Sequence, residues 1–96
     1  MQRVPGISTA PKELDELQEI ARVATRAALE GYEPLSKEWE KNLTLGIFFE
    51  GDERIFELYI AAERPAEVVV ISTARVNRKT RDVVVTILNL AERNRS

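Results

Sequence analysis

The chain has 96 residues, enough for one domain, and its 14 basic and 16 acidic side chains leave a formal net charge of −2. It contains no cysteine and no histidine, which excludes disulfides, thiolate nucleophiles and a Ser-His-Asp triad. Without these ligands we expect no transition-metal site, and we expect no cofactor. No apolar run approaches the roughly 20 residues that cross a bilayer, and residues 1–6 lack the apolar stretch of a signal peptide. We therefore expect a cytoplasmic protein with no membrane partner.

The first expected element is a helix over residues 11–30, preceded by an N-terminal arm at residues 1–10. Apolar residues recur in this helix at spacings of three and four, which is typical of an amphipathic helix. Pro11 suits the first turn, where its missing N–H has no consequence. Thr9 is the expected N-cap, and Gly31 suits the residue that follows the helix.

Four strands are predicted after the helix, at residues 38–49, 54–62, 67–76 and 82–90, because polar and apolar residues alternate and Val and Ile are frequent. Turns at residues 50–53 and 77–80 and a break at 63–65 separate them. This order predicts an α+β domain over residues 11–90, with one long N-terminal helix packed on a four-stranded antiparallel meander sheet. Residues 91–96 are expected to form a polar tail. The expected core consists of Leu17, Ile20, Leu45, Phe56, Leu58, Val70 and Val85.

Three stretches carry a resemblance to known domains, namely residues 56–60 (FELYI), 64–68 (RPAEV) and 74–80 (ARVNRKT). Their rhythm is similar to that of cystatin-like domains, and it resembles the N-terminal accessory domain of copper amine oxidases and PepSY-type modules. The resemblance implies one helix lying across a curved antiparallel sheet and a non-catalytic role. It carries over no functional residue, because Arg81 replaces the usual glycine and the Gln-x-Val-x-Gly loop of inhibitory cystatins is absent.

Basic residues gather around the predicted turn at 77–80, where the cluster consists of Arg75, Arg78, Lys79 and Arg81. Such a cluster suits a phosphate or an acidic partner surface, or alternatively it is a solvated turn at the end of the sheet. Nucleic acid is an unexpected partner, because the chain is net acidic and no aromatic ladder accompanies the basic residues. The acidic turn at 50–53 lacks the ligand number and spacing of a calcium loop, so we expect no metal there.

An alternative site is a pocket built from Trp39, Glu57 and Tyr59. Cystatin-like sheets curl into pockets, and Glu57 alternates with Ile55 and Tyr59 on a predicted strand. A carboxylate held in an apolar pocket is suited to acid/base chemistry. A strand Glu is otherwise solvated or paired with Arg, and the aromatic residues otherwise pack in the core or at an edge. We therefore assign no catalytic residue.

The third and fourth predicted strands are apolar on both faces. Because one helix covers only one face, the other face exposes an apolar patch unless a partner covers it. The residues predicted on that face are Phe48, Tyr59, Val69, Ile71 and Val84. A homodimer through this face is expected, since most small oligomers are twofold. The alternatives are a curved sheet covered by loops, Trp39 and the arm, or a one-residue register shift that moves these side chains inside.

Together these features favour a non-catalytic protein-binding module, of the inhibitor or immunity type, that binds through its sheet face or loops. One alternative is a small-ligand-binding or enzymatic cystatin-like pocket protein. Another is an engineered or designed scaffold, which the absence of His and Cys and the single Met allow. A thermal-shift ligand screen separates the first two, because a pocket protein gains stability when its ligand binds.

Overall fold

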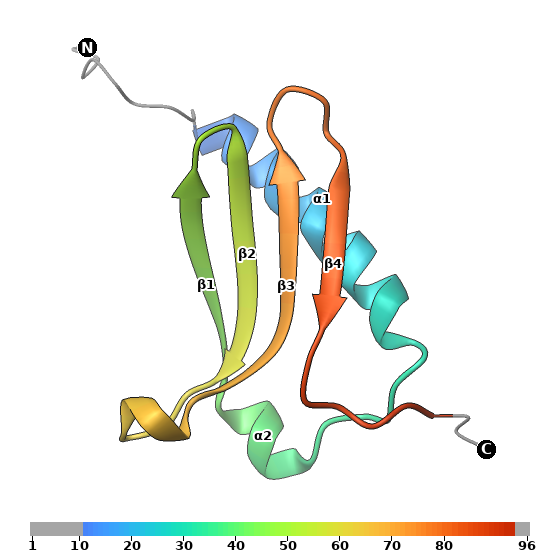
Figure 1. The fold of residues 1–96 in the computed structure, drawn as a ribbon, viewed down its shortest axis with the longest axis vertical. Coiled ribbons are helices and arrows are strands. Elements are labelled where there is room, and N and C mark those ends of the chain that lie inside the picture. The colour runs from blue at the N-terminus through green and yellow to red at the C-terminus, as the bar shows by residue number, and fades with distance from the viewer. Residues whose placement is uncertain (1–10, 94–96) are drawn as a thin grey trace.

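The computed structural model describes residues 11–93, so the predicted arm and the last three residues of the predicted tail lie outside the described residues. Figure 1 shows one long helix, α1 (Pro11–Leu29), lying across one face of a four-stranded sheet. The strands are β1 (Leu43–Glu50), β2 (Glu53–Ile60), β3 (Val69–Asn77) and β4 (Val83–Ile87). Each pairs antiparallel with the next in the order β1-β2-β3-β4, which confirms the predicted α+β meander.

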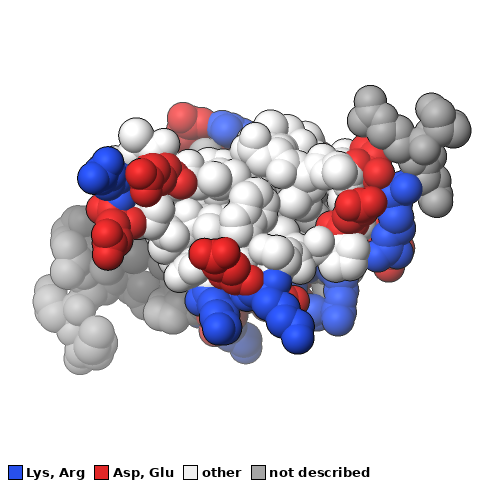
Figure 2. Space-filling view, turned by 90° about the horizontal axis from the view of Figure 1, so that it is seen from below, with Lys and Arg blue, Asp and Glu red and all other residues white. Residues whose placement is uncertain are grey.

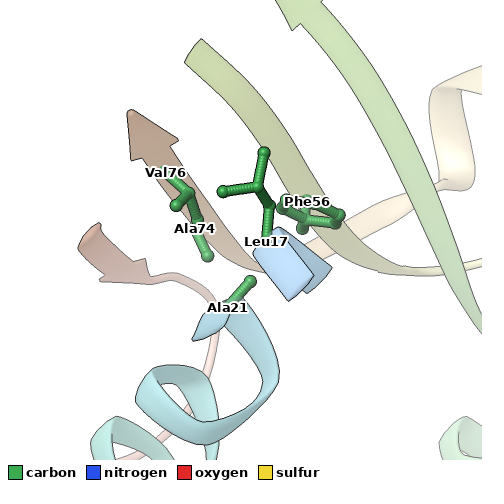
Figure 3. Packing of buried hydrophobic residues seen from close by; sticks show 5 residues of the cluster. All are labelled: Leu17, Ala21, Phe56, Ala74 and Val76. Atoms are coloured by element: carbon green, nitrogen blue, oxygen red, sulfur yellow. The ribbon is translucent and has the colours of Figure 1, made fainter. Parts of the chain in front are cut away.

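The core lies between α1 and the middle of β2 and β3. Leu17 and Ala21 of α1 pack against Phe56 of β2 and against Ala74 and Val76 of β3 (Figure 3). All five side chains are at most 3% exposed. Phe56 lies directly opposite Ala74 in the sheet, and paired residues share a face, so both point towards the helix.

The predicted core is correct only in part. Leu17 and Phe56 are buried, and Ile20 and Val85 are half-buried against the same cluster. Leu45, however, is 40% exposed on β1, and Leu58 is half-buried. Val70 lies opposite Tyr59, on the face turned away from α1. Two features of the structure cause these differences, namely a bulge in β3 and the path of α1 across the sheet.

The bulge reverses the faces predicted for the first half of β3. Leu58 lies opposite Ser72, but the next residue, Tyr59, lies opposite Val70, so Ile71 is an extra residue in β3. An extra residue interrupts the alternation of side chains between the two faces of a strand. Ile71 is consequently buried, with 1% of its surface exposed.

The same reversal moves Val69 to the helix side, where it lies opposite Ile60. The prediction that Val69 and Ile71 face away from the helix is therefore wrong, and the shifted register is the correct alternative. Phe48, Tyr59 and Val84 do lie on the face away from α1, which we call the open face.

The predicted first strand begins too early, because residues 37–41 form a short helix. In α2 (Lys37–Lys41) the Ser36 hydroxyl accepts a hydrogen bond from the Trp39 N–H at 3.2 Å. Such a cap satisfies a backbone donor that the first helical turn leaves unpaired. Trp39 therefore lies on a helix and not on a strand. A 3₁₀ helix, η1 (Pro65–Glu67), begins at the end of the predicted break and includes residue 67, so the third strand begins two residues later than predicted, at Val69.

The helix leaves half of the sheet uncovered. A helix with its side chains is about 10–12 Å wide and strands lie about 4.8 Å apart, so one helix covers roughly two strands. α1 crosses the sheet obliquely and packs mainly on β3 and β4, and less on β2 (Figure 1). On the helix side of β1, Leu43, Leu45 and Phe49 remain 38%, 40% and 51% exposed.

Candidate functional site

An apolar groove of about 390 Å³ lies between α1 and the uncovered half of the sheet. The wall on α1 is formed by Ala21, Thr25 and Leu29, and the floor by Leu45, Phe56 and Leu58. The volume falls within the range of about 300–1,000 Å³ that is usual for binding pockets. Sequence reasoning missed this site, because it assigned Leu45 and Leu58 to a closed core. The sequence did contain a signal for the groove, because it predicts one helix and four strands, and one helix covers only about two strands.

The apolar surface continues towards the end of the sheet near α2. A second hollow of about 150 Å³ shares Leu29 and Leu58 with the groove and also borders Ile71 and Leu90. Two backbone hydrogen bonds close this end, from Glu33 N–H to the Ala91 carbonyl at 2.9 Å and from Arg93 N–H to the Gly31 carbonyl at 2.8 Å. Figure 2 views this end of the molecule, where uncharged residues fill the centre and charged side chains lie around the margin.

The border of the groove on α1 is polar and carries two arginines. Gln18, Arg22 and Arg26 line this border. The Arg22 guanidinium donates two hydrogen bonds to the Glu19 carboxylate, at 2.9 and 2.6 Å. These bonds raise the pKa of Arg22 and lower the pKa of Glu19 from their ordinary values. Arg26 forms no ion pair within residues 11–93, so its charge remains available to an acidic group.

All four residues of the predicted basic cluster have carboxylate partners within the chain. Around the turn, the ion pairs are Arg78 with Glu13 at 3.3 Å, Arg81 with Glu16 at 3.5 Å, and Lys79 with Asp52 at 3.7 Å. The Arg78 backbone N–H also donates to the Asp52 carbonyl at 2.8 Å. These contacts join the first turns of α1 to both sheet turns, so the charges of the cluster are paired within the chain.

The fourth member, Arg75, lies on the open face between two glutamates. Its guanidinium pairs with Glu53 at 2.8 Å and also with Glu50. The hydrogen bonds that the Arg75 guanidinium donates to the Glu53 and Glu50 carboxylates raise the pKa of Arg75. This ion-pair cluster lies next to Ile55, which is directly opposite Arg75 in the sheet. The open face is therefore less apolar than the sequence predicts.

The apolar part of the open face centres on Gly46. A Cβ atom added there would lie 3.3 Å from Tyr59 Cε1 and 3.4 Å from Phe48 Cζ, so both rings close over the glycine. Phe48 is 49% exposed, and Val84, at the other edge of the sheet, is 63% exposed. The structure thus brings Phe48 and Tyr59 together. Val84 lies on β4, and β3 separates it from Tyr59 on β2.

The residues of the predicted pocket lie on two elements, with Trp39 on α2 and with Glu57 and Tyr59 on β2. Trp39 borders a hollow formed with Pro34, Leu35 and Leu90, which neither Glu57 nor Tyr59 borders. Glu57 and Tyr59 both lie on β2, where Glu57 is opposite Gly46. No group of three or more Asp or Glu side chains that could hold a metal ion occurs within residues 11–93.

Arg54 is a buried cation that sequence reasoning did not single out. It is 0% exposed, and its Nη1 donates to the Gly51 carbonyl at 2.9 Å and to the Glu53 carbonyl at 3.0 Å. Its guanidinium also lies 4.3 Å from the centre of the Phe49 ring, a cation–π contact. The sequence contained a signal for this burial. Arg54 lies two residues before Phe56 on a strand, so both side chains point to the same face of the sheet, towards α1. These bonds hold the β1–β2 turn.

In the part of the chain that the structure describes, no helix is both long and apolar enough to cross a membrane. No family model, curated protein or solved structure matches the chain. The groove is therefore interpreted from its own shape and chemistry.

Proposed function

We propose that this domain is a non-catalytic protein-binding module that holds its partner in the groove between α1 and β1. The observation that carries the proposal is the groove itself, an apolar hollow with a volume of about 390 Å³ that α1 leaves open. Open apolar surface of this kind, bordered by polar residues, is typical of interaction sites. The uncovered side chains of β1 enlarge it, since Leu43 and Leu45 are 38% and 40% exposed.

The chemistry of the groove defines what the partner must supply. Apolar side chains of the partner would displace water from Leu45, Leu58 and Phe56, and burial of apolar surface favours association. A carboxylate of the partner would lie near Arg26, which has no ion pair within residues 11–93. Arginine is well suited to such pairs, because its planar guanidinium donates two parallel hydrogen bonds.

Binding of this kind needs neither a nucleophile nor a proton-transfer group. That requirement agrees with a chain that has no histidine and no cysteine. An inhibitor or an immunity-type protein acts by occupying the surface of another protein, and the groove offers the docking face that this role needs.

A second candidate function is the binding of a small apolar ligand in the same groove. The observation that favours it is the volume, which lies within the usual range for ligand pockets. A thermal-shift screen distinguishes the two functions. A small ligand raises the melting temperature of the isolated domain, by an amount that grows with its concentration, whereas a protein-binding module responds to its partner.

The direct test uses two matched variants, each of which replaces an exposed apolar strand residue by glutamate. Leu45→Glu places the charge in the groove, and Val84→Glu places it on the open face. Partners are captured from extracts of the source organism on wild type and both variants, and binding is then measured with the purified partner. We expect Leu45→Glu to weaken binding about 30-fold or more, as for a residue contributing at least 2 kcal/mol. Equal affinities for wild type and a folded Leu45→Glu would contradict the proposal.

A further inference from the structure

β1 is an open edge of the sheet. It pairs with β2 over its full length, and its other side pairs with no segment in residues 11–93. An unpaired edge can add a further strand, and proteins usually prevent this with lysine, proline or a bulge. Residues 43–49 contain no charged residue and no proline, and their pairing with β2 is free of bulges. β1 therefore has none of these protective features over most of its length.

The other edge of the sheet differs. β4 spans Val83–Ile87, three residues fewer than β1, and α1 packs directly on it. In Figure 1 the C-terminal half of α1 extends past this edge. Covering an edge with a helix is one of the ways in which proteins block strand addition. β1 is thus the edge available for pairing.

The groove is also incomplete on the β1 side. α1 forms one wall, but beyond Leu45 the floor ends at the open edge, with no second wall in the described part of the chain. A strand added at β1 would extend the floor. A second helix on the same side of the extended sheet would supply the missing wall.

We propose that two copies of this chain pair through β1, antiparallel, to form one eight-stranded sheet with both α1 helices on the same face. A twofold axis perpendicular to the sheet generates this arrangement, and twofold dimers are the commonest oligomers. The inference rests on the proposed function, because the dimer would join two half-open grooves into one groove with two walls. It differs from the dimer that the sequence predicts through the open face.

The charges along β1 agree with this pairing. Residues 43–49 are uncharged, so antiparallel pairing brings no like charges together in the centre of the interface. Glu50 lies at one end of β1 and Lys41 lies just before the other end. In an antiparallel pair, Glu50 of one copy lies near Lys41 of the other copy, although Glu50 also pairs with Arg75 of its own chain. Lys41 forms no ion pair within residues 11–93 and so remains available.

The first test is the mass of the wild-type protein by sedimentation equilibrium across a concentration series. We expect a species of twice the 10.9 kDa chain mass at high micromolar concentration. A monomer at every concentration overturns the proposal.

The second test locates the interface by disulfide cross-linking, for which the cysteine-free chain is a clean background. Single cysteines replace residues 44 to 48 in turn, and Val84→Cys is the exposed control on β4. Paired antiparallel strands place opposite Cα atoms about 4.5–5.5 Å apart, within disulfide range. We expect cross-linking to be strongest at one position of β1 and to decline on either side of it. Cross-linking at Val84 but not along β1 overturns the proposal in favour of the open face.

These results separate the two proposals. A monomeric wild type that still binds a partner in the groove overturns the dimer alone. A dimer cross-linked through β1 whose Leu45→Glu variant binds the partner as tightly as wild type overturns the proposed function alone.

Discussion

Replacing Leu17 by alanine tests whether the stability of this domain depends on packing between α1 and the sheet. Leu17 is the largest fully buried apolar side chain in residues 11–93, and it contacts residues from β2 and β3. Truncating a fully buried leucine removes transfer free energy and leaves a cavity, at a cost of about 3–4 kcal/mol. A domain of 96 residues has an unfolding free energy of roughly 5–14 kcal/mol, so this variant loses a large fraction of it.

The assay is urea unfolding followed by circular dichroism, with Val23→Ala as the matched control on the same helix. Val23 is 53% exposed, so its truncation should change the unfolding free energy by no more than about 0.5 kcal/mol. For Leu17→Ala we expect an unchanged slope, a lower midpoint and a melting temperature reduced by about 12–30 °C. A loss below about 1 kcal/mol for Leu17→Ala would refute the placement of α1 on β2 and β3.

Three further predictions concern single polar groups. The buried Ser72 hydroxyl has no hydrogen-bond partner in the described residues, so Ser72→Ala should raise the unfolding free energy by up to about 1 kcal/mol. A decrease of more than about 0.5 kcal/mol, measured by urea unfolding, would contradict this prediction. Ser36→Ala removes the cap of α2 and should lower the unfolding free energy by about 1 kcal/mol in the same assay, whereas no change would show that the cap is not needed. The pKa of Glu19 is lowered mainly by its hydrogen bond with Arg22, so that bond stabilises the fold at neutral pH and is lost as the pH falls through the lowered pKa. A carboxyl NMR titration should show the pKa of Glu19 rising in Arg22→Met, and an unchanged pKa would contradict the pairing.

The fold was predictable because strong local signals agreed. Periodicity at three and four residues defined α1 to within one residue of its observed end at Leu29. The turns at residues 50–53 and 77–80 separated strands of alternating pattern, and the meander then required only sequential pairing. These signals are local in the sequence, so they can be recognised without knowledge of the tertiary contacts.

The errors came from features that local patterns do not encode. The bulge at Ile71 inserts one residue without a turn signal, and it moved Val69 and Ile71 to the helix side. Trp39 alternates with glutamates as a strand residue would, but the cap by Ser36 places it on a helix.

The groove was missed for a geometric reason. Sequence patterns show that one helix packs on a four-stranded sheet, but they do not show which strands it covers. Because α1 packs mainly on β3 and β4, Leu45 lies in the groove and Val85 lies against the core. The ion pairs of Arg78 and Arg81 with α1 depend on the same placement of the helix.

The most direct test of the groove as the binding surface is amide chemical-shift mapping with 1-anilinonaphthalene-8-sulfonate. This probe combines an apolar aromatic body with an anionic group, which matches the apolar lining and the neighbouring Arg26. We predict that the amide chemical-shift changes caused by the probe cluster at Thr25, Leu29 and Leu45. We also predict that Leu45→Glu abolishes these changes, whereas Val84→Glu on the open face does not. Shifts confined to the open face, or no binding to the folded protein, would contradict the assignment of the groove as the docking surface.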